Sequence, residues 1–131
     1  MERLIAETTF LIDLEREAAR GASGPATAFL KDHAAVELAI TPIIAGELAC
    51  GTSLAARSRW HDFVSRFRWL PHDDEVAWHY GATYRYLQTQ GLLIGANDLW
   101  IAATGLANRV PVLTRNVPHY ERVPGLEVLA Y

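Results

Sequence analysis

The stretch Leu4–Glu17, LIAETTFLIDLERE, predicts a strand that runs straight into a helix. Its apolar start, Leu4–Ala6, suits a short buried strand, and residues 8–20 carry apolar side chains at helical spacing. One acidic residue, Glu7, stands between the two elements. Its carboxylate could cap the helix, or it could serve as a ligand at the carboxyl end of a strand.

The remainder of the chain repeats this alternation of strand and helix. We expect further strands at 36–40, 68–70, 110–114 and 126–130. We expect further helices at 25–33, 41–51, 54–67, 74–90 and 98–108. Gly51 ends the helix at 41–51 and separates it from the helix at 54–67. Alternation of this kind predicts an α/β fold, an α/β/α sandwich around a central, mainly parallel sheet. With no repeat or linker, we interpret residues 1–131 as a single domain.

The overall charge gives no argument for nucleic-acid binding. The net charge is −3, so an RNA or DNA substrate would require bound cations or a local basic patch to offset the repulsion. Four basic residues do cluster in one segment: Arg57, Arg59, Arg66 and Arg68. They could form such a patch, but we interpret them as the solvated face of a helix.

Composition and the N-terminal residues indicate where the protein resides. No apolar run approaches the roughly 20 residues of a membrane-spanning helix. Glu2 and Glu7 interrupt the first residues, which therefore do not resemble a signal peptide. The one cysteine, Cys50, cannot form an internal disulfide, and we expect it to be buried on a helix. We therefore expect a cytoplasmic protein.

Polar residues stand at or near the ends of several predicted strands. They are Glu7, Glu47, Asp98 and Asn116. Ligands bind outside the carboxyl ends of parallel strands, so these side chains could converge there and bind a divalent cation such as Mg²⁺. Such an ion can activate water or stabilise charge on a phosphodiester. Each acid also has a plain alternative: Glu7 and Asp98 could be helix caps, and Glu47 an exposed helix residue.

Three segments together resemble a known family. LIAETTFLIDLERE (4–17), ITPIIAGELACG (40–51) and GANDLWIAATGLANRVPVLTRNVPHYERVPGLEVLAY (95–131) are similar to PIN-domain ribonucleases. More specifically, they resemble VapC-type toxins of type II toxin–antitoxin systems. The resemblance covers nearly the whole chain, and its last segment is the most specific part.

The resemblance implies an endoribonuclease that depends on Mg²⁺ or Mn²⁺ and cuts an RNA substrate. It implies inhibition by a VapB-type antitoxin, a homodimer, and a heterotetramer or larger assembly with that antitoxin. Residue by residue, Glu7 falls on the family's first catalytic Asp, while Glu47 and Asp98 fall on two further metal-binding acids. Asn116 falls on a fourth position of the site. Thr8, Thr9 and Arg115 stand beside these residues as possible support.

The first acid departs from the family pattern, because Glu7 replaces the usual Asp. One extra methylene displaces the carboxylate, and Mg²⁺ requires near-ideal octahedral geometry. Glu7 could belong to an active natural variant, to a weakened nuclease, or to a substitution that disarms a toxin. A competing hypothesis is therefore a catalytically silent PIN-like module that binds an antitoxin-like protein or RNA.

Three residues near the C-terminus have open roles. Arg115 could contact a phosphate or be an exposed structural residue. His119 and Tyr120 could stack a base or pack against the core, and we expect core packing.

Overall fold

Five short strands form one parallel sheet in the computed structural model, which describes residues 2–131. In sheet order the strands are β3 (Arg68–Trp69), β2 (Glu37–Ile40), β1 (Arg3–Ala6), β4 (Val112–Leu113) and β5 (Val128–Leu129). All four strand pairings are parallel, which confirms the predicted sheet. Because the strands are parallel, the chain leaves β1, β2 and β4 at the same edge.

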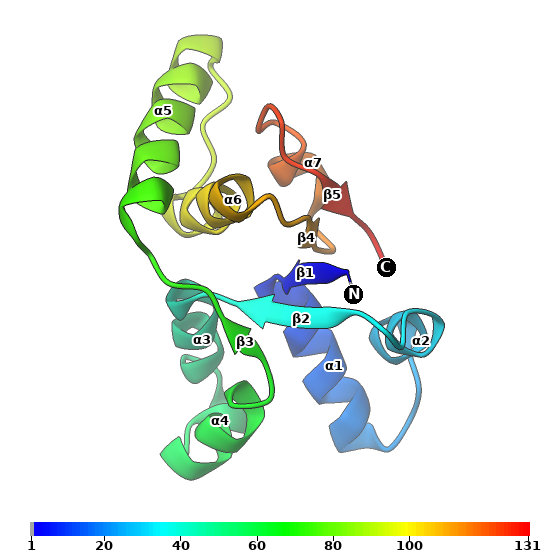
Figure 1. Ribbon diagram of the computed structural model, residues 1–131. Helices are drawn as coiled ribbons and strands as arrows, with labels where there is room; N and C mark the ends of the chain where they lie inside the picture. The colour runs from blue at the N-terminus through cyan, green and yellow to red at the C-terminus, as the bar shows by residue number, and fades with distance from the viewer. Residues whose placement is uncertain (1) are drawn as a thin grey trace.

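Helices cover the sheet. They are α1 (Thr8–Arg20), α2 (Pro25–Asp32), α3 (Pro42–Ala49), α4 (Arg57–Val64), α5 (Asp74–Gln90), α6 (Ala96–Asn108) and α7 (Val117–Tyr120), with a 3₁₀ turn, η1, at Thr52–Leu54. In Figure 1, β1 and β2 pass between α1, α2 and α4 on one side and α5, α6 and α7 on the other. The predicted α/β/α sandwich is confirmed. None of the helices in residues 2–131 combines the length and hydrophobicity needed to cross a bilayer.

The centre of the sheet explains the apolar start of the chain. In β1, Leu4, Ile5 and Ala6 are fully or almost fully buried. A strand that is covered on both faces needs apolar side chains in both directions, so a continuous apolar run replaces alternation. Phe10 of α1 continues this core and meets Phe29 of α2 edge to face, with ring centroids 5.9 Å apart.

Three local predictions were wrong. The helix expected at 54–67 is divided into η1 and α4, because Ala56 takes an extended conformation between them. The helix expected to open at Asp98 begins at Ala96, with Gly95 as its N-cap. Cys50 is exposed, because it stands at the C-cap of α3, beyond the buried Leu48.

The basic segment is solvated, as we expected, but it is not one helix face, because Arg66 and Arg68 lie beyond the end of α4 at Val64. Its four arginines are all exposed: Arg57, Arg59, Arg66 and Arg68. The guanidinium of Arg66 lies over the ring of Phe63, 4.6 Å from its centroid. Part of this segment therefore covers apolar surface with the stem and head of an arginine.

A buried carboxylate holds the first two helices together. Glu17 of α1 is 2% exposed and accepts hydrogen bonds from the backbone N–H groups of Gly24, Ala26 and Thr27 at the start of α2. A Cβ on Gly24 would lie 2.6 Å from the Glu17 carboxyl carbon, so a larger residue there would displace this carboxylate from its hydrogen bonds. Burial acts to raise the pKa of Glu17, but these hydrogen bonds outweigh it and leave that pKa lowered.

We expect Glu17→Gln to lower the thermal stability at pH 7, because the amide group would turn an N–H toward a backbone N–H. Wild type is more stable than the variant above the pKa that Glu17 has in the unfolded chain, near 4.5. This advantage is lost as the pH falls below that value through the lower pKa of the folded protein. Thermal melts of the variant and of Glu15→Gln, whose carboxylate caps no helix, check this. Equal losses in both variants at pH 7 would contradict the assigned cap.

Candidate active site

Glu7 stands where β1 passes into α1, and it is both a helix cap and a site residue. Its backbone N–H donates to the carbonyl oxygen of Leu113 in β4 (3.0 Å), and the side chain is 4% exposed. Its Oε2 accepts from the Thr9 N–H (3.0 Å), the Thr9 hydroxyl (2.7 Å) and the Thr114 hydroxyl (3.0 Å). The capping alternative is therefore correct, and the same carboxylate lies at the carboxyl ends of two strands.

The environment of Glu7 opposes its negative charge. Burial raises the pKa of Glu7; the hydrogen bonds from Thr9 and Thr114 lower it in part, and the nearby Asp98 carboxylate raises it again. The net direction is upward. A buried acid with a raised pKa beside a second acid is typical of a functional site, because no fold requires two such charges to approach.

Glu47 approaches the same place from α3. Its Oε1 accepts from the Thr8 hydroxyl (2.5 Å), and its Oε2 accepts from the Asn97 side-chain amide (3.3 Å). The alternative of an ordinary exposed helix residue is wrong, because Glu47 is partly buried and bonded to both α1 and α6. The adjacent threonines thus serve different acids: Thr8 orients Glu47 and Thr9 orients Glu7.

Asp98 lies in the first turn of α6, but its side chain does not cap that helix. Its Oδ1 accepts from the Tyr120 hydroxyl (3.1 Å), and its Oδ2 lies 3.4 Å from Nδ1 of His119. The Asn116 amide nitrogen lies 2.8 Å from the same His119 nitrogen. Because the amide nitrogen can only donate, His119 Nδ1 accepts from it and has no proton left for Asp98. Asn116 therefore contacts His119 but is not joined to Asp98 by a continuous chain of hydrogen bonds.

Tyr120 is the site residue that sequence reasoning missed. It packs in the core, as we expected, and is fully buried. Burial raises the pKa of its hydroxyl, and the nearby Glu7, Asp98 and Glu47 carboxylates raise it further. The electrostatic influence of all three predicted acids reaches this hydroxyl, but only Asp98 is hydrogen-bonded to it. The structure therefore places the acids at one edge of the sheet without bringing all three into contact. Nothing in the sequence distinguishes this tyrosine from a purely structural one.

The oxygen donors suit a hard divalent cation, but they do not form a closed cage. Mg²⁺ uses one or two protein carboxylates and completes its shell with water and substrate phosphate. Glu7, Glu47 and Asp98 can each supply a carboxylate oxygen of this kind. Within residues 2–131, however, no three His, Cys, Asp or Glu side chains converge closely enough to surround an ion.

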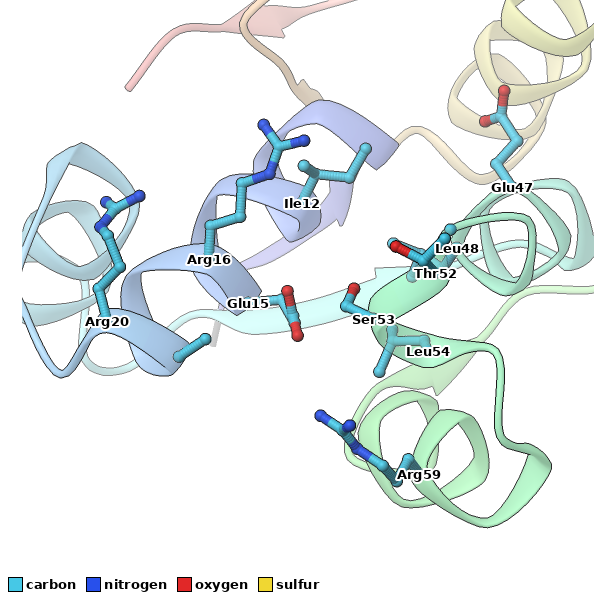
Figure 2. Close-up of a pocket in the computed structure, with 12 residues that line it drawn as sticks. Ile12, Glu15, Arg16, Arg20, Glu47, Leu48, Thr52, Ser53, Leu54 and Arg59 are labelled. Atoms are coloured by element: carbon cyan, nitrogen blue, oxygen red, sulfur yellow. The ribbon is translucent and has the colours of Figure 1, made fainter.

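A groove runs from this cluster along α1. Figure 2 shows its lining: Ile12, Leu48 and Leu54 form apolar walls, and Glu47 stands at one end. Arg59 of α4 and Glu15 of α1 face it from opposite sides. The groove therefore combines apolar walls with charged side chains, Arg16 and Arg20 among them, and opens beside Glu47.

Comparison with known proteins agrees with this geometry. The PIN domain family model matches residues 5–125. The chain belongs to the PIN-domain family. Ribonuclease VapC1 of Rickettsia felis is 31% identical over 134 residues, which cover 96% of this chain and 94% of that protein. Ribonuclease VapC2 of the same organism is 31% identical over 94 residues, covering 68% of this chain and 70% of that protein. These relatives place this PIN domain in the VapC-type branch.

Solved structures share the fold of this PIN domain. VapBC2 from Rickettsia felis bound to a promoter DNA fragment gives a TM-score of 0.79 at 24% identity, covering 98% of each chain. DNA-bound VapBC from Salmonella typhimurium gives 0.77 at 25% identity, covering 99% of this chain and 98% of that one.

We expect Glu7→Gln to stabilise this PIN domain at pH 7, by roughly 1 kcal/mol. Glutamine keeps the oxygen that accepts from Thr9 and Thr114 but has no charge to bury. Because the folded pKa of Glu7 is raised, wild type loses stability as the pH rises above 4.5, the ordinary value, through that raised pKa. The gain should therefore be large at pH 7 and small at pH 4 in thermal melts. The exposed Glu121→Gln serves as control, and a gain independent of pH would contradict the assignment.

Proposed function

We propose that this protein is the ribonuclease toxin of a VapBC-type toxin–antitoxin pair and that it hydrolyses RNA phosphodiesters with Mg²⁺ or Mn²⁺. The observation that carries this proposal is a set of uncharged hydroxyl groups that each hold one of three acids: Thr9 and Thr114 bond Glu7, Thr8 bonds Glu47, and Tyr120 bonds Asp98. The acids come from three separate segments of the chain, at one edge of the parallel sheet. The relatives named as VapC ribonucleases support the same chemistry.

In this proposal Glu7, Glu47 and Asp98 hold the divalent ion, with Asn116 in a supporting place. The ion, when bound, lowers the pKa of a water and stabilises charge on the phosphodiester. The chain's own hydroxyl groups orient the acids. Thr9 and Thr114 hold one oxygen of Glu7, Thr8 holds one oxygen of Glu47, and Tyr120 holds one oxygen of Asp98. Each hydrogen bond fixes one rotamer without adding a countercharge, so the site stays negative and attracts cations.

The antitoxin is the proposed partner of the groove in Figure 2. Relatives with this fold were solved as VapBC complexes, and the groove offers apolar walls next to Glu47. An inserted segment with apolar side chains would fill the channel and obstruct the acids. Assembly as a homodimer, and as a heterotetramer or larger with the antitoxin, stays a prediction of the resemblance.

The second candidate function is a silent module that binds protein or RNA without cutting. One specific observation favours it. Oε2 of Glu7, at the family's first acid position, already accepts three hydrogen bonds, so only Oε1 remains for an ion. The two candidates differ in metal binding and in cleavage, which the following variants separate.

We expect Asp98→Asn to reduce RNA cleavage by about 100-fold or more. Changes in residues that only orient metal ligands cost about 10–100-fold, and the loss of a ligand should cost at least as much. Cleavage of a labelled RNA pool with Mg²⁺, with Mn²⁺ and with EDTA measures this. The exposed Asp62→Asn of α4 is the matched control and should cut like wild type. Cleavage that persists in EDTA would contradict the metal-dependent mechanism.

We expect Glu7→Asp to cut RNA at least as fast as wild type, because Asp is the residue that the family pattern places there. The same cleavage assay, with isothermal titration of Mn²⁺, measures activity and metal binding side by side. If neither form cuts RNA and the Asp variant binds no metal, the silent module is the correct function. Toxicity that returns in cells with Glu7→Asp alone would identify Glu7 as a disarming residue.

A further inference from the structure

A second hollow lies beside α1 and shares two lining residues, Arg16 and Arg20, with the groove. Its lining includes Asp13, Arg16, Glu17, Arg20, Arg115 and Tyr131. We propose that this hollow binds phosphate groups of the RNA strand that enters the active site, and we name it the arginine pocket. The inference rests on the proposed ribonuclease function and adds the path that the substrate follows.

The charges of the arginine pocket favour an anion. Three arginines face it, whereas one of its two acids, Glu17, turns its carboxylate into the start of α2. The other acid, Asp13, is paired with the Arg115 guanidinium. A positive excess is therefore left in a chain whose net charge is −3, and it supplies the local basic patch that a nucleic-acid substrate needs.

Arg115 connects the arginine pocket with the acids. Its backbone N–H donates to the Thr9 hydroxyl oxygen (3.0 Å), the same hydroxyl that donates to Glu7. Its contacts with Asp13, 3.1 and 3.2 Å long, both use Nη1. With the side chain 58% exposed, the other N–H donors of the guanidinium face solvent. Arginine presents such donors in a planar fork that suits phosphate oxygens.

The C-terminal tyrosine positions Arg115 through Asp13. The Tyr131 hydroxyl donates to Oδ2 of Asp13 (2.5 Å), and its ring packs edge to face on the buried Phe10, with centroids 4.8 Å apart. Asp13 is thus fixed from the core side before it meets the guanidinium. A cation held in place in advance loses less conformational entropy when it binds phosphate.

Arg16 and Arg20 extend the positive charge along α1. They stand four residues apart, about 6 Å along the helix axis, and Figure 2 shows both side chains on the same side of α1. Both are exposed and line the arginine pocket. Together with Arg115 they form a row that leads from the acids outward, as a phosphate backbone would run.

RNA fits this row better than the antitoxin does. Arg16 and Arg20 border the groove as well, but Arg115 and Tyr131 line only the arginine pocket. The groove also has three arginines in its lining, but it adds two glutamates and the apolar side chains of Ile12, Leu48 and Leu54. In the arginine pocket both acids are already engaged, Asp13 by Arg115 and Glu17 by the start of α2. The backbone N–H of Arg115 is also linked to Glu7 by way of the Thr9 hydroxyl.

RNA affinity at several salt concentrations tests the proposal. Fluorescence anisotropy of a labelled, unstructured RNA of about ten nucleotides is measured in EDTA, so that binding is observed without cleavage. Each phosphate contact on single strands contributes about 0.7 to the slope of log Kd against log salt concentration. Arg115→Ala and Arg16→Ala should each lower that slope by about 0.7 and weaken binding. Arg57→Ala, an exposed arginine of α4, is the matched control and should leave the slope unchanged.

A double-mutant cycle tests the positioning role of Tyr131. Tyr131→Phe keeps the ring on Phe10 but removes the hydroxyl that donates to Asp13. We expect it to weaken RNA binding by about threefold in wild type, and to have no effect in the Arg115→Ala background. A loss of equal size in both backgrounds would overturn the positioning role.

The other outcomes separate this inference from the proposed function. Unchanged slopes for Arg16→Ala and Arg115→Ala would overturn the arginine pocket, and so would an equal change for Arg57→Ala. The arginine pocket is also overturned if these variants bind RNA normally but lose an antitoxin that copurifies with wild type. If RNA binds with the expected slopes but is not cut with Mg²⁺ or Mn²⁺, the arginine pocket stands and the nuclease function is wrong.

Discussion

The rest of the structure depends on the hydrogen bonds to one buried carboxylate, that of Glu7. Thr9 and Thr114 reach it from the first turn of α1 and from the end of β4, and the Glu7 backbone bonds to Leu113. A buried charge without partners would cost several kcal/mol. Three donors on one oxygen reduce that cost, and they also fix where α1 begins relative to β1 and β4. The same hydrogen bonds therefore cap α1 and position the Glu7 carboxylate of the candidate site.

The placement of the other acids follows from this junction. Once Glu7 and Thr9 fix the first turn of α1, Thr8 faces α3, where its hydroxyl bonds Glu47. On the far side, Tyr120 bonds Asp98 from within the core. Neighbouring carboxylates disfavour one another's charged form, and a basic side chain nearby would offset this. Here uncharged hydroxyl groups orient them instead, so the negative charge of the site is kept. The Arg115 guanidinium is paired with Asp13.

Sequence periodicity predicted the sheet and most helices because the core imposes it. The apolar run of β1 and the strand–helix alternation follow from burial on both faces of a parallel sheet. The start of α6 was misplaced because Asp98 has the composition of a cap, while the true cap, Gly95, has no side chain to signal it. Tyr120 was missed because a buried tyrosine has the same sequence signal whether its hydroxyl bonds a backbone carbonyl or a carboxylate of the candidate site. The sequence alone could not establish that the acids lie at one edge of the sheet, because they are far apart in the chain.

The length of the Glu7 side chain can now be considered in terms of its two oxygens. A residue that caps a helix and also binds an ion must divide its lone pairs between the N–H and O–H donors and the cation. In this chain all three hydrogen bonds to the Glu7 side chain end on Oε2, which leaves Oε1 free of the capping role. The extra methylene of Glu7 places both carboxylate oxygens further from the backbone. A shorter aspartate would hold both oxygens near the Thr9 N–H. Glu7 therefore silences the site only if Oε1 cannot reach an ion shared with Asp98, and the bonds that fix Oε2 limit how far Oε1 can move.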